Sequence, residues 1–499
     1  TGIGHNVLAS NTTGTQNVAV GTFALDSNTT ANNNIAIGYN AGSEITTGDQ
    51  NTAIGSFTLD ANTTGANNTA VGRSSLSANT TASNNTGIGY YALLLNTTGG
   101  SNVAVGSETL DANTTGSRNT ALGRTSLGAN TTGSDNVGYE ALEVSTTGNN
   151  NIGIGFEALR SNTSGIDNVV IGAEAGESQT TAGQNVAIGR KALRQNQTSE
   201  GNTAVGSHAM QNTTAANNTG IGNYALQQNT TGSANTAVGA NASDSCTTGY
   251  NNVAIGSSAL SSLTTGGSNV AIGRSALANF DNNDNTAVGA NSLQEATNGH
   301  NNVAVGMSAM YNTTSGVFSA AVGRSAMGGN TTGGYSAALG YFALAACQTN
   351  NFNVAVGYLA LRYSTVGSNT AIGSEALQTN TTGTYNVAVG RKSLDGNTTG
   401  NNQTAVGYNA LASNTTGNDN VAVGAYALDA NTTASNNTAV GYGSLGLNTT
   451  GENNVSIGFL ALDANTTGQN NTALGYEALG ANTTANNNTA VGSLALDAN

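Results

Sequence analysis

The sequence predicts an all-β protein, a parallel β-solenoid (a β-roll or β-helix) of about 30 coils of 17 residues. Three observations support this prediction. One motif recurs every 17 residues from end to end. Each repeat holds one short apolar segment rich in β-branched residues, which favours a strand. The rest of each repeat is Asn, Thr and Gly, a turn composition, and it is too short for a pair of helices.

The period is measured from the glycine that ends each Ala-Val-Gly or Ala-Ile-Gly string, here named the anchor glycine. The anchors run from Gly4 to Gly492 and number 30. Of the 29 intervals between them, 25 are 17 residues, three are 16 and one is 15. The 16-residue intervals lose a residue from the polar stretch. The 15-residue interval, which ends at Gly138, loses two residues from the apolar stretch, so we expect a structural defect there.

The three residues before each anchor form the predicted strand, as in Val103-Ala104-Val105. The outer two are nearly always Val, Ile, Leu or Thr, and the central one is usually Ala. Side chains alternate between the two faces of a strand. We expect the β-branched residues to point inward and the Ala to form a flat outward strip. This predicted lateral packing strip, for self-association, comprises Ala19, Ala36, Ala53, Ala70, Ala104 and Ala121.

The polar part of the repeat carries two Asn columns, one four residues before the anchor and one seven residues after it. Stacked Asn side chains can form hydrogen-bonded ladders along the solenoid. In the second column Asn gives way to Ile45, Cys246, Leu263 and Cys347, which indicates an inward or half-buried position. Most of these Asn residues belong to Asn-Thr-Thr glycosylation sequons. The ladders alone account for them.

We expect one continuous array over residues 1–499. The chain begins and ends within a repeat, and neither terminus shows a polar capping coil. We interpret it as a piece of a longer protein. Uncapped solenoids tend to associate, so the partner we expect first is another copy of the chain.

Two strings carry a family resemblance: Asn102-Val103-Ala104-Val105-Gly106 and Asn185-Val186-Ala187-Ile188-Gly189. Each is followed by a small residue and Leu, as in the head repeats of trimeric autotransporter adhesins, the YadA-like or haemagglutinin-type heads. The pattern also resembles repeats of tail-fibre-like surface proteins. The resemblance covers the whole chain but only about half of each repeat, which is longer here than is usual in those heads. It implies a left-handed roll, a homotrimer and an extracellular or cell-surface location.

The inventory of reactive side chains predicts no catalytic residue, no cofactor and no metal site. His5, His208 and His300 fall in different repeats, and the two Cys are six coils apart. Asp-x-Asn pairs such as Asp60 and Asn62 place oxygen ligands at a spacing suited to Ca²⁺. Most repeats lack the Asp, so we interpret it as an exposed, solubilising residue. We expect a protein that is not an enzyme.

The charge composition indicates which classes of binding partner are disfavoured. The formal net charge is −14, with 12 basic and 26 acidic residues, which disfavours nucleic acid and anionic membranes. The sequence has no apolar run of about 18 residues, so we expect no direct membrane insertion.

The residue directly after the anchor forms a column that we name the contact stripe. Half of the basic residues stand in it together with many Tyr, a composition that interfaces favour. The stripe is predicted to contact a neighbouring chain, or a glycan or protein of a host surface. The candidate contact residues within this column are Tyr39, Arg73, Tyr90, Arg124, Arg190, Arg274, Arg324, Tyr358, Arg391 and Tyr408.

The function predicted from these features is an extracellular structural fibre or adhesin shaft or head, without catalysis. An alternative is the subunit of a self-assembling surface filament. A less favoured alternative is an ice-binding solenoid, because flat Thr ranks can order water. The rank concerned includes Thr63, Thr80, Thr97 and Thr114.

Overall fold

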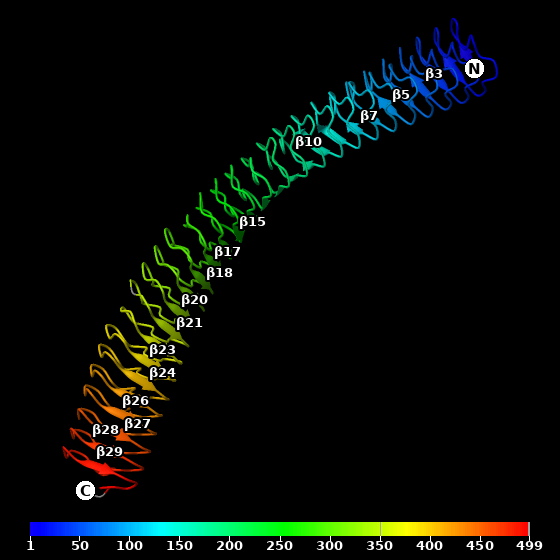
Figure 1. The fold of residues 1–499 in the computed structure, drawn as a ribbon. Helices are drawn as coiled ribbons and strands as arrows, with labels where there is room; N and C mark the ends of the chain where they lie inside the picture. The colour runs from blue at the N-terminus through cyan, green and yellow to red at the C-terminus, as the bar shows by residue number, and fades with distance from the viewer. Residues whose placement is uncertain (350, 498–499) are drawn as a thin grey trace. The chain divides into compact units, whose positions relative to one another are not determined.

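The computed structural model describes residues 1–349 and 351–497. It confirms an all-β parallel β-solenoid with one short strand per coil and no helix in these ranges. The chain divides into two compact units, residues 1–250 and 251–499, and each is described by itself. Within each unit the strands follow one another in chain order (Figure 1). A single array over residues 1–499 stays a prediction.

The strands of the first unit are β1 Gly2–Ile3, β2 Val18–Val20, β3 Ile35–Ile37, β4 Thr52–Ile54, β5 Thr69–Val71, β6 Thr86–Ile88, β7 Val103–Val105, β8 Thr120–Leu122, β9 Val137–Ala141, β10 Ile152–Ala158, β11 Val169–Ile171, β12 Val186–Ile188, β13 Thr203–Val205, β14 Thr219–Ile221 and β15 Thr236–Val238. Those of the second unit are β16 Val253–Ile255, β17 Val270–Ile272, β18 Thr286–Val288, β19 Val303–Val305, β20 Ala320–Val322, β21 Ala337–Leu339, β22 Val354–Val356, β23 Thr370–Ile372, β24 Val387–Val389, β25 Thr404–Val406, β26 Val421–Val423, β27 Thr438–Val440, β28 Val455–Ile457, β29 Thr472–Leu474 and β30 Thr489–Val491.

Successive coils stack in register, so each residue lies against its equivalent in the next coil. Ala104 of β7, for example, pairs in parallel with Ala121 of β8. The backbone hydrogen bonds continue through the turns. Leu59 N–H donates to the Ser75 carbonyl at 3.1 Å, and Thr63 N–H donates to the Thr80 carbonyl at 2.8 Å. The turns are therefore as firmly tied to their neighbours as the strands, which satisfies backbone groups that an isolated loop would leave open.

The core lies on the opposite side of the strand from the one we predicted. The central Ala of each strand is buried, and the flanking β-branched residues, including Val105, lie on the outer face. The six alanines of the expected lateral packing strip are at most 1% exposed, so that prediction is wrong for every one of them. They are Ala19, Ala36, Ala53, Ala70, Ala104 and Ala121.

Interior volume explains this inversion. In most coils the residue four after the anchor is a fully buried Leu or Met, which fills the space beneath the strand. Where Gly87 stands in the Ala column, an added Cβ would already lie 3.5 Å from Leu76 Cδ1. Val170 occupies the Ala column only in the coil where Gly176 replaces that Leu, and a Cβ on Gly176 would lie 3.4 Å from Val170 Cγ1. In regular coils the close-packed interior admits one large side chain, and Leu takes that place. A second one, such as Leu263 or Phe280, is buried only where it replaces the Asn of the second ladder.

Two tight corners shape each coil. The anchor Gly106 has a φ of 140°, and a Cβ there would lie 2.6 Å from the Gly123 carbonyl oxygen, so only glycine fits. Leu110 adopts a left-handed φ of 53°, which is unusual for a bulky residue. Full burial of a Leu side chain stabilises by about 1.5–3 kcal/mol, which outweighs the roughly 1–2 kcal/mol cost of that conformation.

Both Asn columns are buried ladders, as predicted. In the second column Asn79 Nδ2 donates to Asn62 Oδ1 at 2.9 Å and to the Ala82 carbonyl at 3.0 Å. In the first column Asn68 N–H donates to Asn51 Oδ1 at 3.0 Å. The inward position inferred from the four substitutions named above is confirmed, since each of them is at most 1% exposed. These are Ile45, Cys246, Leu263 and Cys347.

The predicted defect is present in β9 and β10, but Gly138 is not an anchor. It pairs with Ala121 and lies in the Ala column, and Tyr139 pairs with Leu122 in the strand. Ala141 pairs with Ala158 after a shift of register, so Glu140 alone stands opposite Gly155, Phe156 and Glu157. This coil therefore lacks the anchor glycine and the contact-stripe residue that normally follows it.

The first prediction tests which face of the strand is buried. Ala104→Glu places an uncompensated charge in a closed interior, so we expect it to destabilise the surrounding coils by about 3–5 kcal/mol. Ser101→Glu in the same coil lies at an exposed position and should change stability by less than about 0.5 kcal/mol. Denaturant unfolding, with hydrogen exchange to localise the effect, measures both. Equal effects would contradict the assignment.

The second prediction concerns the ladder at Asn96, whose Nδ2 donates to Asn79 Oδ1 at 3.0 Å and to the Gly99 carbonyl at 2.9 Å. Asn96→Asp replaces a donor by a buried carboxylate that faces two acceptors. We expect a loss of about 3–5 kcal/mol at neutral pH. Asn96→Leu imitates Leu263 and should cost about 1–3 kcal/mol. Thermal unfolding compares them, and an Asp variant as stable as the Leu variant would argue against the ladder.

Candidate functional surface

The outer face of the strands forms a continuous surface along each unit. It carries the two residues that flank the buried Ala, and none of them is charged. Ile54 is 37% exposed and Ile88 39% exposed. A three-residue strand spans about 10 Å and each coil adds about 4.8 Å, so fifteen strands form a face of roughly 700 Å². Seven strands of the first unit begin with Thr, so this face is uncharged and combines Thr with aliphatic residues. Apolar patches above a few hundred Å² mark interaction sites on soluble proteins, and the aliphatic column of the face is the part that qualifies.

The contact stripe lies along one edge of this face, because each of its residues follows the strand and the anchor glycine. All ten predicted members are exposed: Tyr39, Arg73, Tyr90, Arg124, Arg190, Arg274, Arg324, Tyr358, Arg391 and Tyr408. The structure confirms their shared position, and what they contact stays a prediction. Tyr139, which also follows a glycine in the sequence, does not belong to the stripe because it lies in the strand.

Within the stripe, neighbouring coils place rings and cations over one another. Arg73, Arg324 and Arg391 each hold their guanidinium 5.8–5.9 Å from the ring centroid of the Tyr one coil later. Aromatic neighbours stack: the Tyr442 and Phe459 rings are 5.4 Å apart, and the Phe459 and Tyr476 rings 5.5 Å. The stripe therefore forms ordered ladders. The cation–π pairs contribute about 0.5–1 kcal/mol each at exposed sites.

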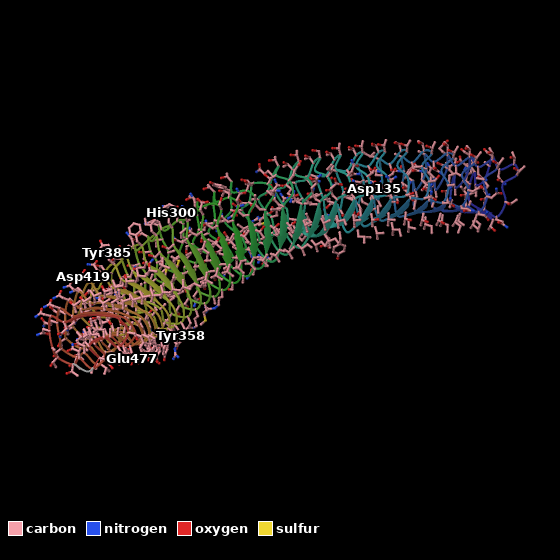
Figure 2. All side chains as sticks on the ribbon, turned by 60° about the horizontal axis from the view of Figure 1, so that its bottom comes forward. Asp135, His300, Tyr358, Tyr385, Asp419 and Glu477 are labelled. Atoms are coloured by element: carbon pink, nitrogen blue, oxygen red, sulfur yellow. The ribbon has the colours of Figure 1, made fainter. Side chains whose placement is uncertain are left out.

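A second edge was missed by the sequence analysis. It consists of the residues five before each anchor. In the second unit, Figure 2 shows Tyr385 and Asp419 of this edge on the opposite side of the solenoid from Tyr358 of the contact stripe. Phe318, Tyr335 and Phe352 stack here at centroid distances of 5.4 Å. Their 17-residue spacing was the signal that could have revealed them.

A shallow groove of about 550 Å³ adjoins these three rings. It opens where Ala320 and Ala337 replace the larger residues of the outer strand face, and where Ser319 and Ser336 replace Asn in the first ladder. The outer face is therefore locally hollowed in the second unit. The groove forms because these adjacent coils carry smaller side chains than the equivalent positions of other coils.

The reactive side chains are dispersed in the described residues. No group of three or more His, Cys, Asp or Glu there could hold a metal ion. His5, His208 and His300 each pack against an aromatic ring of the next coil. Cys246 and Cys347 are both buried. Over the same part of the chain, no helix has the length and apolarity needed to cross a membrane.

The aspartates of the Asp-x-Asn pairs are not simply exposed, as we had interpreted them. Burial raises the pKa of Asp60, although Ser77 Oγ donates a hydrogen bond to its Oδ1 at 2.6 Å. Burial likewise raises the pKa of the equivalent aspartates in other coils, because the charged form loses hydration. These are Asp26, Asp111, Asp244, Asp395, Asp429 and Asp463.

Comparison with known proteins adds no family. No family model matches the chain, and no curated protein is similar to it.

The third prediction follows from the raised aspartate pKa values. The folded state holds these protons more tightly than the unfolded state, whose carboxyls titrate near 3.8. Their contribution to stability is therefore complete below that pH and is lost as pH rises through the folded values. We expect a higher denaturation midpoint near pH 4 than near pH 7.

Asp60→Asn with Asp111→Asn should flatten this dependence. Asp135→Asn is the control of opposite sign, because the hydrogen bond from Arg118 lowers the pKa of Asp135. Its stabilising contribution is present above the unfolded value of 3.8 and is lost only as pH falls through the lowered folded pKa. Removing it should therefore lower the midpoints at pH 7 and pH 4 by similar amounts and leave the difference between them nearly unchanged. A wild-type midpoint that falls between pH 7 and pH 4 contradicts the prediction.

Proposed function

We propose that the protein is an extracellular structural fibre or adhesin shaft, without catalysis, whose chains associate side by side through the outer face of the strands. The observation that carries this proposal is the uncharged strand face that continues along each unit. A monomer would leave this surface in water. Association removes it, and the burial of apolar area is the main driving force for such contacts.

The size of the face supports a stable assembly. Roughly 700 Å² per unit approaches the ~800 Å² that each partner contributes to a standard interface. We propose a homotrimer, the number implied by the resemblance to YadA-like heads, with the strand faces turned toward a common axis. The contact stripe then lies at the edge of each face, where it can contact the neighbouring chain or a glycan or protein of a host surface.

Ice binding is the weaker proposal on physical grounds. The hydroxyl of Thr63 donates to the Thr80 carbonyl at 3.1 Å, and Thr97 donates to the Thr114 carbonyl at 3.0 Å. These hydroxyl protons are used within the solenoid, so the rank offers water mainly lone pairs and methyl groups. The Thr rank is explained by its role in joining coils.

The fourth prediction tests lateral assembly. Ile54→Glu with Ile88→Glu introduces charges into the outer face without touching the core. We expect the wild-type chain to sediment as a trimer and the variant as a monomer at micromolar concentration, with unchanged circular dichroism. Gln50→Glu with Asn84→Glu, on the exposed opposite edge of the same coils, is the matched control and should remain trimeric. A monomeric wild type refutes the proposal, and species that grow with concentration favour the filament.

A further inference from the structure

The repeat defect in the first unit opens a cavity of about 280 Å³ on the contact stripe. Arg124 lies on one side of it and Phe156 on the other, and both are stripe residues. In the coil between them, Glu140 stands where an anchor glycine, a stripe residue and a third residue would normally be. The cavity is thus the space of one missing stripe side chain. We name it the stripe gap.

Regular parts of the stripe show what fills such a space. Phe459 occupies the place between Tyr442 and Tyr476, with ring centroids 5.4 and 5.5 Å away and interplanar angles of 13° and 5°. Tyr90, Tyr341 and Tyr408 each receive the guanidinium of an Arg one coil earlier. The stripe gap likewise has an Arg one coil earlier, Arg124, and an aromatic ring one coil later, Phe156. Its neighbours match those that enclose a planar aromatic ring elsewhere in the stripe.

The charges around the gap are incompletely paired. Arg160 forms an ion pair with Glu157 at 2.9 Å and approaches Glu177 at 3.9 Å. Glu140 and Glu143 also line the cavity, are exposed, and form no ion pair within the described residues. Two carboxylates therefore remain beside the place of the missing ring. They favour a ligand that carries a cationic group next to its ring.

We propose that the stripe gap binds an aromatic amine. Its ring stacks on Phe156 and lies under the Arg124 guanidinium, and its ammonium group binds Glu140 and Glu143. Phe156 is 62% exposed, so its ring is available for stacking. No bond is made or broken. The site goes beyond the proposed fibre function and is independent of it, because it is built from a single chain.

The experiment measures binding of tyramine to the intact chain by calorimetry. We expect one site per chain, and affinity at least about tenfold weaker for Phe156→Ala and for Glu140→Gln. The matched control is Phe459→Ala, the same substitution in a regular part of the stripe, which should bind as the wild type does. Two partial probes separate the contributions: 4-ethylphenol lacks the amine, and 2-cyclohexylethylamine lacks the aromatic ring. Both should bind at least about tenfold more weakly than tyramine.

Restoring the repeat provides the most direct test. Insertion of Gly-Ser between Tyr139 and Glu140 recreates the string Gly-Ser-Glu-Ala-Leu found at residues 373–377. We expect this variant to keep its circular dichroism and to lose tyramine binding. Should the insertion fail to fold, Phe156→Ala against Phe459→Ala still decides the question.

Three results would overturn the site: absence of tyramine binding at millimolar concentration, binding that survives Phe156→Ala, or equal binding of 2-cyclohexylethylamine. The measurements are repeated in the Ile54→Glu, Ile88→Glu background. If this variant no longer assembles but still binds tyramine, the binding site does not depend on the proposed fibre assembly.

Discussion

The stacking of equivalent residues at the strand spacing is the constraint on which the rest of the structure depends. A coil has one three-residue strand, too short to be stable alone, and its turns contain left-handed residues such as Leu110. In-register neighbours provide hydrogen-bond partners for backbone and side chain alike, as for Asn79 with Asn62. A coil is therefore stable only when it stacks on similar coils. The sequence must repeat because each backbone or side-chain group pairs with the equivalent group of the next coil.

The narrow interior determines what the surface looks like. Each coil encloses about one large apolar side chain, the Leu after the anchor, together with small residues and two asparagines. In one coil Gly176 stands at the Leu position and Val170 at the Ala position. The loss of volume at one position is thus offset by a gain at the other, and the total side-chain volume inside the coil stays nearly constant. The remaining β-branched side chains have no room inside. The strand, which needs them for its conformation, presents them to the outside and creates the apolar face that we assign to association.

Departures from the repeat give the molecule its local chemistry. Two residues absent beside Glu140 open a cavity between Arg124 and Phe156, and small residues at Ala320 and Ala337 hollow the outer face beside stacked rings. In regular coils each stripe side chain packs against its equivalents in the neighbouring coils, which leaves little space for a ligand. A missing or smaller side chain leaves neighbours with exposed rings and unpaired charges, which is where recognition can arise.

The sequence alone determined the fold class, the position of the strands in the regular coils, both Asn ladders, the exposure of the contact stripe and the place of the defect. All of these follow from periodicity, since equivalent residues must share an environment. It misplaced β9, where Gly138 lies within the strand and is not an anchor. It did not determine which strand face is buried. Alternation divides Val103, Ala104 and Val105 into two faces, and hydropathy assigns the larger side chains to the core. The tertiary structure reversed that assignment, because Leu110 from the opposite wall already fills the interior and leaves space beneath the strand for a methyl group only.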